Sequence, residues 1–173
     1  AVEQVNAMLL AEANADCTKA GMGTTIVAAT VIGERLYAAN VGDSRVYYFS
    51  KGKLSAVTKD HSVCQAAVDM GTMSFSEIRG SEDRSKLLKV LGEKEELELK
   101  RKYPPIKICD GDAFIVCSDG FWEYVYETEM EIDLLKSARA HDWAKNMLKR
   151  HIRRAENKGD NYTVICGIFH LDK

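Results

Sequence analysis

Residues 114–123 read Phe-Ile-Val-Cys-Ser-Asp-Gly-Phe-Trp-Glu, and the other elements of the chain can be placed outward from this stretch. The unbroken apolar run 113–117 predicts a strand that is buried on both faces of its sheet. It ends at Ser118, Asp119 and Gly120, where the glycine is expected to let the backbone turn. Most strand-end aspartates only shape a turn or cap a helix. A carboxylate in this place is nevertheless held at the edge of the core, where a metal ion or a substrate can reach it.

Two further strand-and-turn units end in acidic residues of the same kind. Residues 40–45 read Asn-Val-Gly-Asp-Ser-Arg, and residues 159–163 read Gly-Asp-Asn-Tyr-Thr. On its own stretch, Asp43 is explained more simply as a turn residue that pairs with Arg45. Three such units in one chain, with Asp160 in the third, favour a shared site over three unrelated turns.

The apolar patterns predict an α+β fold, with antiparallel sheet and helices packed on it. Runs of β-branched and alternating residues, separated by turn residues, predict an antiparallel meander of up to four strands, then a hairpin and a final strand. The meander is expected at 24–31, 36–41, 45–50 and 54–57, the hairpin at 106–109 and 113–117, and the final strand at 162–169. Residues 93–103 favour one more strand, near an edge because two prolines follow it.

Apolar spacing and capping signals predict helices between and after these strands. Helices are expected at 1–19, from Ser62 to Gly71, at 129–137 and at 141–157. A further short helix is expected after a Ser74–Glu77 capping box. A Thr128–Glu131 capping box marks the start of the helix at 129–137, and Gly159 ends the helix at 141–157. The last of these helices carries an apolar stripe of Trp143, Met147, Leu148, Ile152 and Ala155. His61, where strand gives way to helix, is expected to be a hydrogen-bonded structural residue and not a ligand.

Length and composition indicate one compact domain. The 173 residues are 46% hydrophobic, and a formal net charge of -2 with interspersed signs gives no basic face for nucleic acid. Five cysteines, an odd number without a C-x-x-C pair, are expected to be buried thiols in a reducing compartment. No secretory signal or membrane-spanning run is evident, so we expect a cytoplasmic protein without a membrane partner.

Five blocks of sequence, in one order across almost the whole chain, resemble the metal-dependent protein phosphatase family, also called the protein phosphatase 2C family. The blocks are Gly23-Thr24-Thr25, Ala39 to Arg45, Thr58-Lys59-Asp60-His61, Ser118 to Trp122, and Gly159 to Thr163. Stand-alone bacterial phosphatases are the most similar members. The resemblance implies two antiparallel sheets packed face to face and flanked by helices, with a metal centre at one end of the sandwich.

The resemblance also implies an activity, the hydrolysis of phosphoserine and phosphothreonine in proteins. Asp119 and Asp160 would be ligands of paired Mg²⁺ or Mn²⁺ ions, and Asp43 and Glu123 would lie at a weaker third metal position. Such ions prefer oxygen ligands and lower the pKa of a shared water, which can then attack phosphorus without a phosphoenzyme. Cys117 is expected to point into the core instead of acting as a nucleophile. The family usually has aspartate where Glu123 stands, so a third metal would be held differently.

The N-terminal part of the family's domain has no counterpart in residues 1–173. Its Asp-Gly-His-Gly-Gly metal motif and phosphate-binding arginine are expected before Ala1, because the chain opens inside a helical pattern without a capping residue. The chain is therefore expected to be a partial catalytic domain, in which no catalytic residue is assigned. Sheet edges exposed by the missing strands would favour self-association.

Two alternatives stay open beside the phosphatase. One is a catalytically inactive, phosphatase-like binding module. The other is a phosphatase of the sporulation or stress-regulator type, which acts on one dedicated serine-phosphorylated partner. The expected partners are phosphorylated proteins, including a Ser/Thr kinase and its substrates, and not nucleic acid.

Overall fold

The computed structural model describes residues 2–93, 103–156 and 159–171 in two compact units, each of which is considered by itself. The first unit comprises 1–26, 40–43 and 59–102, and the second comprises 27–39, 44–58 and 103–173. None of the helices within the described residues is both long and apolar enough to cross a membrane.

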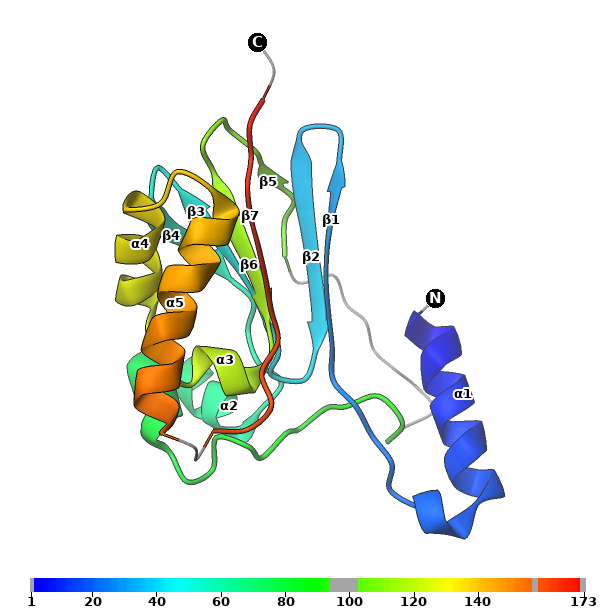
Figure 1. The fold of residues 1–173 in the computed structure, drawn as a ribbon. Coiled ribbons are helices and arrows are strands. Elements are labelled where there is room, and N and C mark those ends of the chain that lie inside the picture. Colours follow the sequence, from blue (N-terminus) through cyan, green and yellow to red (C-terminus); the bar gives the residue numbers. More distant parts are fainter. Residues whose placement is uncertain (1, 94–102, 157–158, 172–173) are drawn as a thin grey trace. The chain divides into compact units, whose positions relative to one another are not determined.

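Two antiparallel sheets form the framework of the second unit (Figure 1). The three-stranded sheet has the order β1 (Ile26–Ile32), β2 (Arg35–Val41), β5 (Ile106–Lys107). The four-stranded sheet has the order β4 (Lys53–Val57), β3 (Arg45–Ser50), β6 (Ala113–Cys117), β7 (Val164–Ile168). Strand β6 is paired along its whole length with β3 on one side and with β7 on the other. The predicted central strand is confirmed.

Side chains from both sheets form one core between them, which confirms the predicted sandwich. Leu36 of β2 and Tyr48 of β3 are both 2% exposed and belong to this core with Ile108. Partly buried side chains that pack against it come from both sheets and their flanks: Ala29, Ala56, Ile106, Phe114 and Phe169. The Tyr48 hydroxyl donates to Asp112 Oδ2 at 2.5 Å, and burial raises the pKa of Tyr48 above its usual value.

The strands lie close to their predicted bounds, but two predicted pairings are wrong. The meander is split, because β2 pairs with β1 and β5 whereas β3 pairs with β4 and β6. The hairpin of 106–109 with 113–117 does not form either, since β5 pairs with β2 in the opposite sheet. Successive strands here cross from one sheet to the other, which local alternation does not encode. The strand predicted at 93–103 falls largely on 94–102, which lie outside the described residues.

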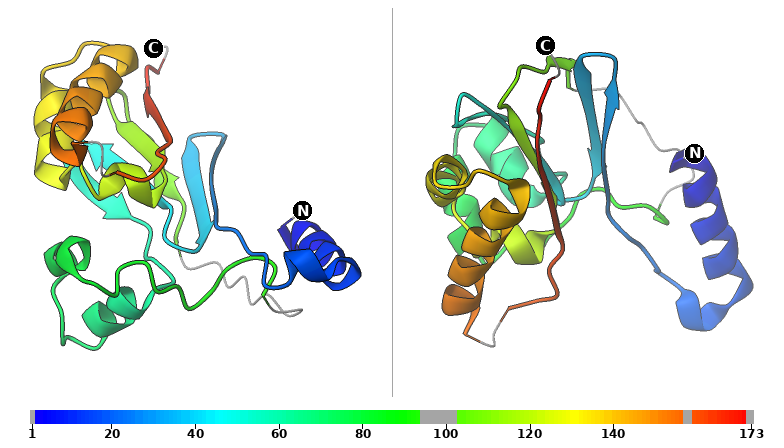
Figure 2. Two further views of the ribbon diagram at one scale, coloured as in Figure 1. Left: turned by 60° about the horizontal axis from the view of Figure 1, so that its bottom comes forward. Right: turned by 45° about the horizontal axis from the view of Figure 1, so that its top comes forward.

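Helices α4 (Glu127–Leu135) and α5 (Ala140–Ala155) cover the outer face of the four-stranded sheet, and Figure 2 shows them side by side in both views. Trp143 of α5 packs edge-on against Phe49 of β3, with ring centroids 5.3 Å apart. The predicted apolar stripe is wrong at one point, because Ile152 is 60% exposed and His151 is buried in its place. The helix ends at Ala155, before the predicted stop at Gly159, with Glu156 in the left-handed conformation at φ 41°.

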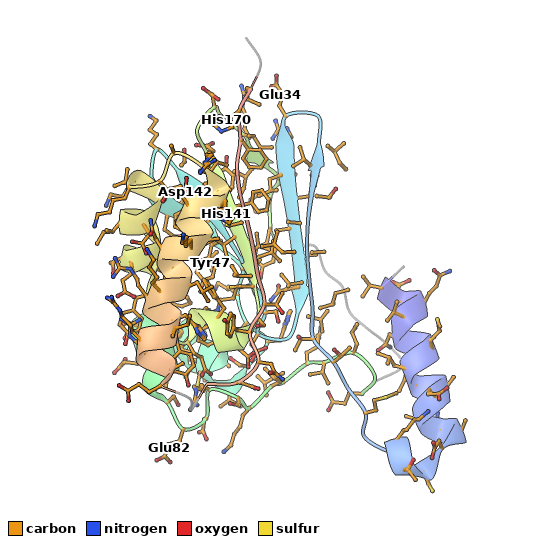
Figure 3. All side chains as sticks on the ribbon, viewed as in Figure 1. Glu34, Tyr47, Glu82, His141, Asp142 and His170 are labelled. Carbon is orange, nitrogen blue, oxygen red and sulfur yellow. The ribbon has the colours of Figure 1, made fainter. Side chains whose placement is uncertain are left out.

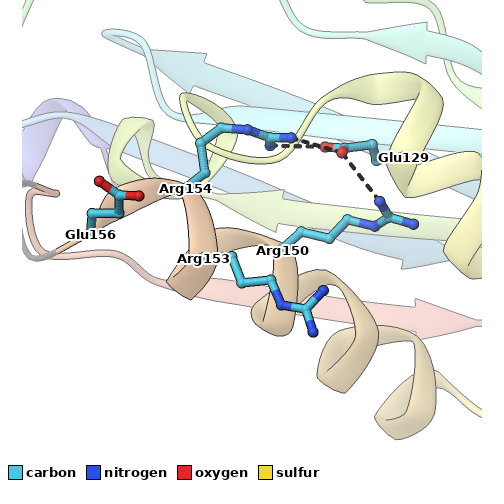
Figure 4. Close-up of a pocket in the computed structure, with 5 residues that line it drawn as sticks. All are labelled: Glu129, Arg150, Arg153, Arg154 and Glu156. Carbon is cyan, nitrogen blue, oxygen red and sulfur yellow. Dashed lines mark hydrogen bonds and ion pairs between the residues drawn. The ribbon is translucent and has the colours of Figure 1, made fainter.

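An ion-pair network joins α4 to α5. Glu129 accepts hydrogen bonds from Arg154 at 2.8 and 2.9 Å and from Arg150 at 3.2 Å, and Figure 4 shows this arrangement beside a pocket. Arg150 also binds Asp133 through two hydrogen bonds of 2.7 and 2.9 Å. The predicted Thr128–Glu131 capping box is wrong, because α4 begins at Glu127. Glu131 instead binds strand β4, accepting from the Leu54 N–H at 2.8 Å.

The first unit contains α1 (Val2–Ala15), α2 (Val63–Asp69) and the 3₁₀ segments Cys17–Lys19 and Phe75–Gly80. Both predicted caps are confirmed: Ser62 accepts from the Gln65 N–H at 3.2 Å, and Ser74 with Glu77 forms a capping box. The five cysteines are free thiols. The expectation that they are buried is wrong for two of them, since Cys17 and Cys109 are exposed.

Candidate metal centre

Asp119 lies at the junction of a rigid strand and a one-turn helix. It follows β6 and is the first residue of α3 (Asp119–Trp122). Because β6 is paired on both sides, the backbone that carries this carboxylate has little freedom to move. Cys117, the last residue of the strand, is 2% exposed, which confirms that it points into the core and not toward the site.

Asp160 is brought to the same end of the sheet by the pairing of β6 with β7. The two strands are antiparallel, and Cys117 is opposite Val164, so the start of β7 lies beside the end of β6. Beyond this pair the contact continues through Ser118, whose N–H donates to Thr163 O at 3.1 Å. The Ser118 hydroxyl in turn accepts from the Thr163 N–H at 3.0 Å.

Gly120 allows the two acidic segments to approach each other still more closely. A β-carbon placed on this glycine would lie 2.4 Å from the Asn161 carbonyl oxygen and 3.4 Å from that of Asp160. Any larger residue would therefore separate Asp119 from Asp160. The Asp160 carboxylate is also oriented locally, since its Oδ1 accepts from the Asn161 N–H at 2.7 Å.

Glu123 is placed on the same side of α3 as Asp119. The two residues are four apart, a spacing that puts side chains on one helix face, and the Glu123 N–H donates to Asp119 O at 3.0 Å. Glu123 is half-buried. The second unit therefore gathers three of the four predicted metal residues at one end of its sheet.

Asp43 belongs to the first unit, in the turn that follows β2. It is 5% exposed, and the turn is held by Asn40, whose amide donates to Gly42 O at 3.3 Å and to Lys59 O at 3.0 Å. The His61 ring accepts from the Gly42 N–H through Nδ1 at 3.3 Å, which confirms His61 as a hydrogen-bonded structural residue. The place of Asp43 at a third metal position stays a prediction.

Arg45 supports the site from within the core, a role that we did not predict from the sequence. It is 1% exposed, and its guanidinium carbon lies 3.6 Å from the centre of the Trp122 ring at the end of α3. Its Nη1 donates to the hydroxyl of Tyr47, a fully buried residue labelled in Figure 3, at 3.0 Å and lies 4.0 Å from Glu127. The signal was available, since an arginine inside an apolar strand needs buried partners.

The donor set fits a hard divalent cation. Among the described ranges, no group of three or more His, Cys, Asp or Glu side chains is arranged to hold a metal ion. Magnesium and manganese, however, prefer oxygen ligands, and Mg²⁺ usually keeps several waters and is held by only one or two carboxylates. The carboxylates of Asp119 and Asp160, on adjoining segments, match this requirement.

The chain is similar in sequence and in fold to known phosphatases. A family model described as Protein phosphatase 2C matches residues 2–67. The serine/threonine phosphatase stp of Listeria welshimeri is 33% identical over 166 residues, which are 95% of this chain and 64% of that protein. The chain thus spans less than two thirds of the length of this curated relative.

Solved structures show the same fold. One described as a bacterial serine phosphatase has a TM-score of 0.84 and 27% identity, and the match covers 99% of this chain and 68% of that one. The catalytic domain of the phosphatase PstP, described as a complex with two manganese ions, has a TM-score of 0.76 and 24% identity over 94% of this chain and 66% of that one. Taken with the sandwich and its acidic end, these similarities show that the chain has the fold of protein phosphatase 2C and is similar in sequence to bacterial serine/threonine phosphatases.

Proposed function

We propose that this chain forms part of a metal-dependent phosphatase that removes phosphate from serine and threonine side chains of proteins. The observation that carries the proposal is the junction of the two acidic segments, which the Ser118–Thr163 hydrogen bonds and the Gly120–Asn161 contact hold together. The name of the Listeria relative, a serine/threonine phosphatase, supports the substrate class.

Asp119 and Asp160 are the proposed ligands of the cation, with Asp43 and Glu123 at a weaker third position. When bound, Mg²⁺ or Mn²⁺ supplies an activated water and offsets the charge that develops on the phosphoryl group. The chain contributes rigidity, because backbone hydrogen bonds on both sides of β6 restrain the strand that leads into Asp119. Preorganised charge of this kind needs no rearrangement during the reaction.

The complete active site is proposed to draw on more of the family's domain than these residues. The chain spans 64% of the Listeria relative, and the resemblance implies a further metal motif and a phosphate-binding arginine. Phosphorylated proteins in the cytoplasm, including a Ser/Thr kinase and its substrates, are the proposed partners.

The test is Mn²⁺-dependent hydrolysis of a phosphothreonine peptide by the full gene product and by its Asp119→Asn variant. We expect that variant to lose more than about 100-fold in kcat/KM, because an essential ligand is removed. The control is Asp142→Asn, which changes an exposed aspartate at the start of α5 (labelled in Figure 3) that pairs with Arg139. Equal activity of wild type and Asp119→Asn would refute the assignment. A folded full-length protein without any turnover would favour the binding module.

A further inference from the structure

His151 of α5 is a buried polar residue beneath the acidic junction. Its side chain is 2% exposed, and its Nε2 lies 2.7 Å from the carbonyl oxygen of Gly120. A carbonyl oxygen only accepts hydrogen bonds, so Nε2 carries the proton and donates. The histidine therefore holds the backbone of the residue that follows Asp119.

The bond from His151 satisfies the Gly120 carbonyl. Gly120 is buried, and α3 is too short to supply a partner further along the helix, since the Tyr124 N–H donates to Phe121 O instead. Without His151, a buried carbonyl would lose its donor, which costs free energy because water cannot replace it. The same glycine abuts the Asp160–Asn161 backbone, so any shift of Gly120 would be transmitted to both acidic segments.

The ring of His151 also contacts the second acidic segment. Its centroid lies 4.0 Å from that of Tyr162, two residues after Asp160, and 5.3 Å from that of Tyr124. The imidazole thus touches both of the chain segments that carry the proposed ligands. Burying it has a cost, because Nδ1 is buried without a hydrogen-bond partner among the described residues. A leucine or phenylalanine would fill the space without this cost, which indicates that the donor is needed.

We propose that His151 is a positioning residue, which sets the spacing of the Asp119 and Asp160 carboxylates for a divalent cation by binding Gly120 and packing on Tyr162. The inference rests on the proposed function, because it requires that Asp119 and Asp160 are ligands of the cation. It predicts that the donor at position 151, and not only the bulk of the side chain, determines cation affinity.

Two substitutions separate the donor from the packing. His151→Leu removes the hydrogen bond, whereas the amide nitrogen of His151→Gln reaches a position similar to Nε2 and can donate to Gly120. Arg153→Gln is the control, since it changes an exposed residue of the same helix. Mn²⁺ affinity is measured by isothermal titration calorimetry on the full gene product, with thermal unfolding as a parallel readout. We expect the Kd of His151→Leu to rise about 10-fold, and those of His151→Gln and Arg153→Gln to stay within about 3-fold of wild type.

A purely structural role would lower the unfolding temperature of both His151 variants and leave the Mn²⁺ affinity of His151→Leu unchanged, which would overturn the inference. Hydrogen exchange in metal-free protein gives an independent reading. The amides of 118–124 and 159–163 should exchange faster in His151→Leu than in His151→Gln, and equal rates would also overturn the inference. If the wild-type protein binds no Mn²⁺, the proposed function is overturned, while the exchange rates still decide whether His151 positions the two segments.

Discussion

Gly120→Ala is expected to separate the two acidic segments directly. The new β-carbon would lie 2.4 Å from the Asn161 carbonyl oxygen and 3.1 Å from the Asn161 carbonyl carbon. Both are backbone atoms, so neither can rotate away as the end of a side chain could. To reach an ordinary contact of 3.4 Å, the Asp160–Asn161 backbone must move by about 1 Å relative to α3.

The expected loss of stability is modest, and the expected loss of metal binding is larger. Overpacking a close contact costs about 1–3 kcal/mol. Alanine regains about 1 kcal/mol over glycine inside a helix, and Gly120 lies in α3, so the net cost should be about 0–2 kcal/mol. A shift of about 1 Å would, however, change the separation of the two segments that carry the proposed ligands. Mn²⁺ affinity should therefore fall by at least about 10-fold.

The assay combines urea unfolding with Mn²⁺ calorimetry on the same preparations. The control is Gly80→Ala, because a β-carbon there would meet nothing within 4 Å and the backbone of Gly80 is not left-handed. Gly120→Ala should lower the urea midpoint slightly with an unchanged slope and weaken Mn²⁺ binding, while the Gly80 control should do neither. A Gly120→Ala protein with wild-type midpoint and wild-type Mn²⁺ affinity would refute the close approach as the basis of the site.

Two further substitutions test the surroundings of the site. Glu129→Gln should destabilise the protein by about 2 kcal/mol at pH 7, because Glu129 accepts charged hydrogen bonds from Arg154 and Arg150. The hydrogen bond from Arg154 holds the pKa of Glu129 below its usual value, so this stabilisation is present above the unfolded-state pKa of about 4.3. It is lost progressively as the pH falls below that value and through the lower folded-state pKa, and a difference between variant and wild type in urea unfolding that does not shrink over this pH range would contradict the ion pairing. Tyr48→Phe should cost about 1–3 kcal/mol, because the Asp112 carboxylate, 2% exposed, loses the hydroxyl donor at 2.5 Å. An unchanged thermal midpoint in that variant would show that the hydroxyl contributes nothing to the core.

Strand positions were predictable because alternation and turn residues act locally. The predicted strand at residues 45–50 has the bounds of β3, and that at 113–117 has the bounds of β6. Sheet membership was not predictable in the same way, because pairing depends on contacts between residues distant in the chain. Strands β2 and β3 are separated by one short turn and yet belong to different sheets.

The acidic residues could be named from the sequence, but the contacts that bring two of them together could not. Asp119 and Asp160 belong to strand-and-turn units of the same kind, and the family resemblance implied their role as metal ligands. Their proximity follows from the antiparallel pairing of β6 with β7 and from the Ser118–Thr163 hydrogen bonds. His151 was missed for a different reason. A helix stripe judged by hydrophobicity passes over a histidine, and only the Gly120 carbonyl in the folded chain explains why it is buried.

The glycine of the Ser-Asp-Gly sequence was expected to free the backbone for a turn, and this explanation is wrong. Gly120 lies inside α3, where its φ is not left-handed and any residue could adopt the conformation. What requires glycine is the space at its α-carbon, which the Asn161 carbonyl occupies. An Asp-Gly pair at the end of a buried strand can therefore indicate that a second backbone segment approaches there. Here that segment carries the second carboxylate, so the glycine that follows Asp119 contributes to the site through a close contact and not through flexibility.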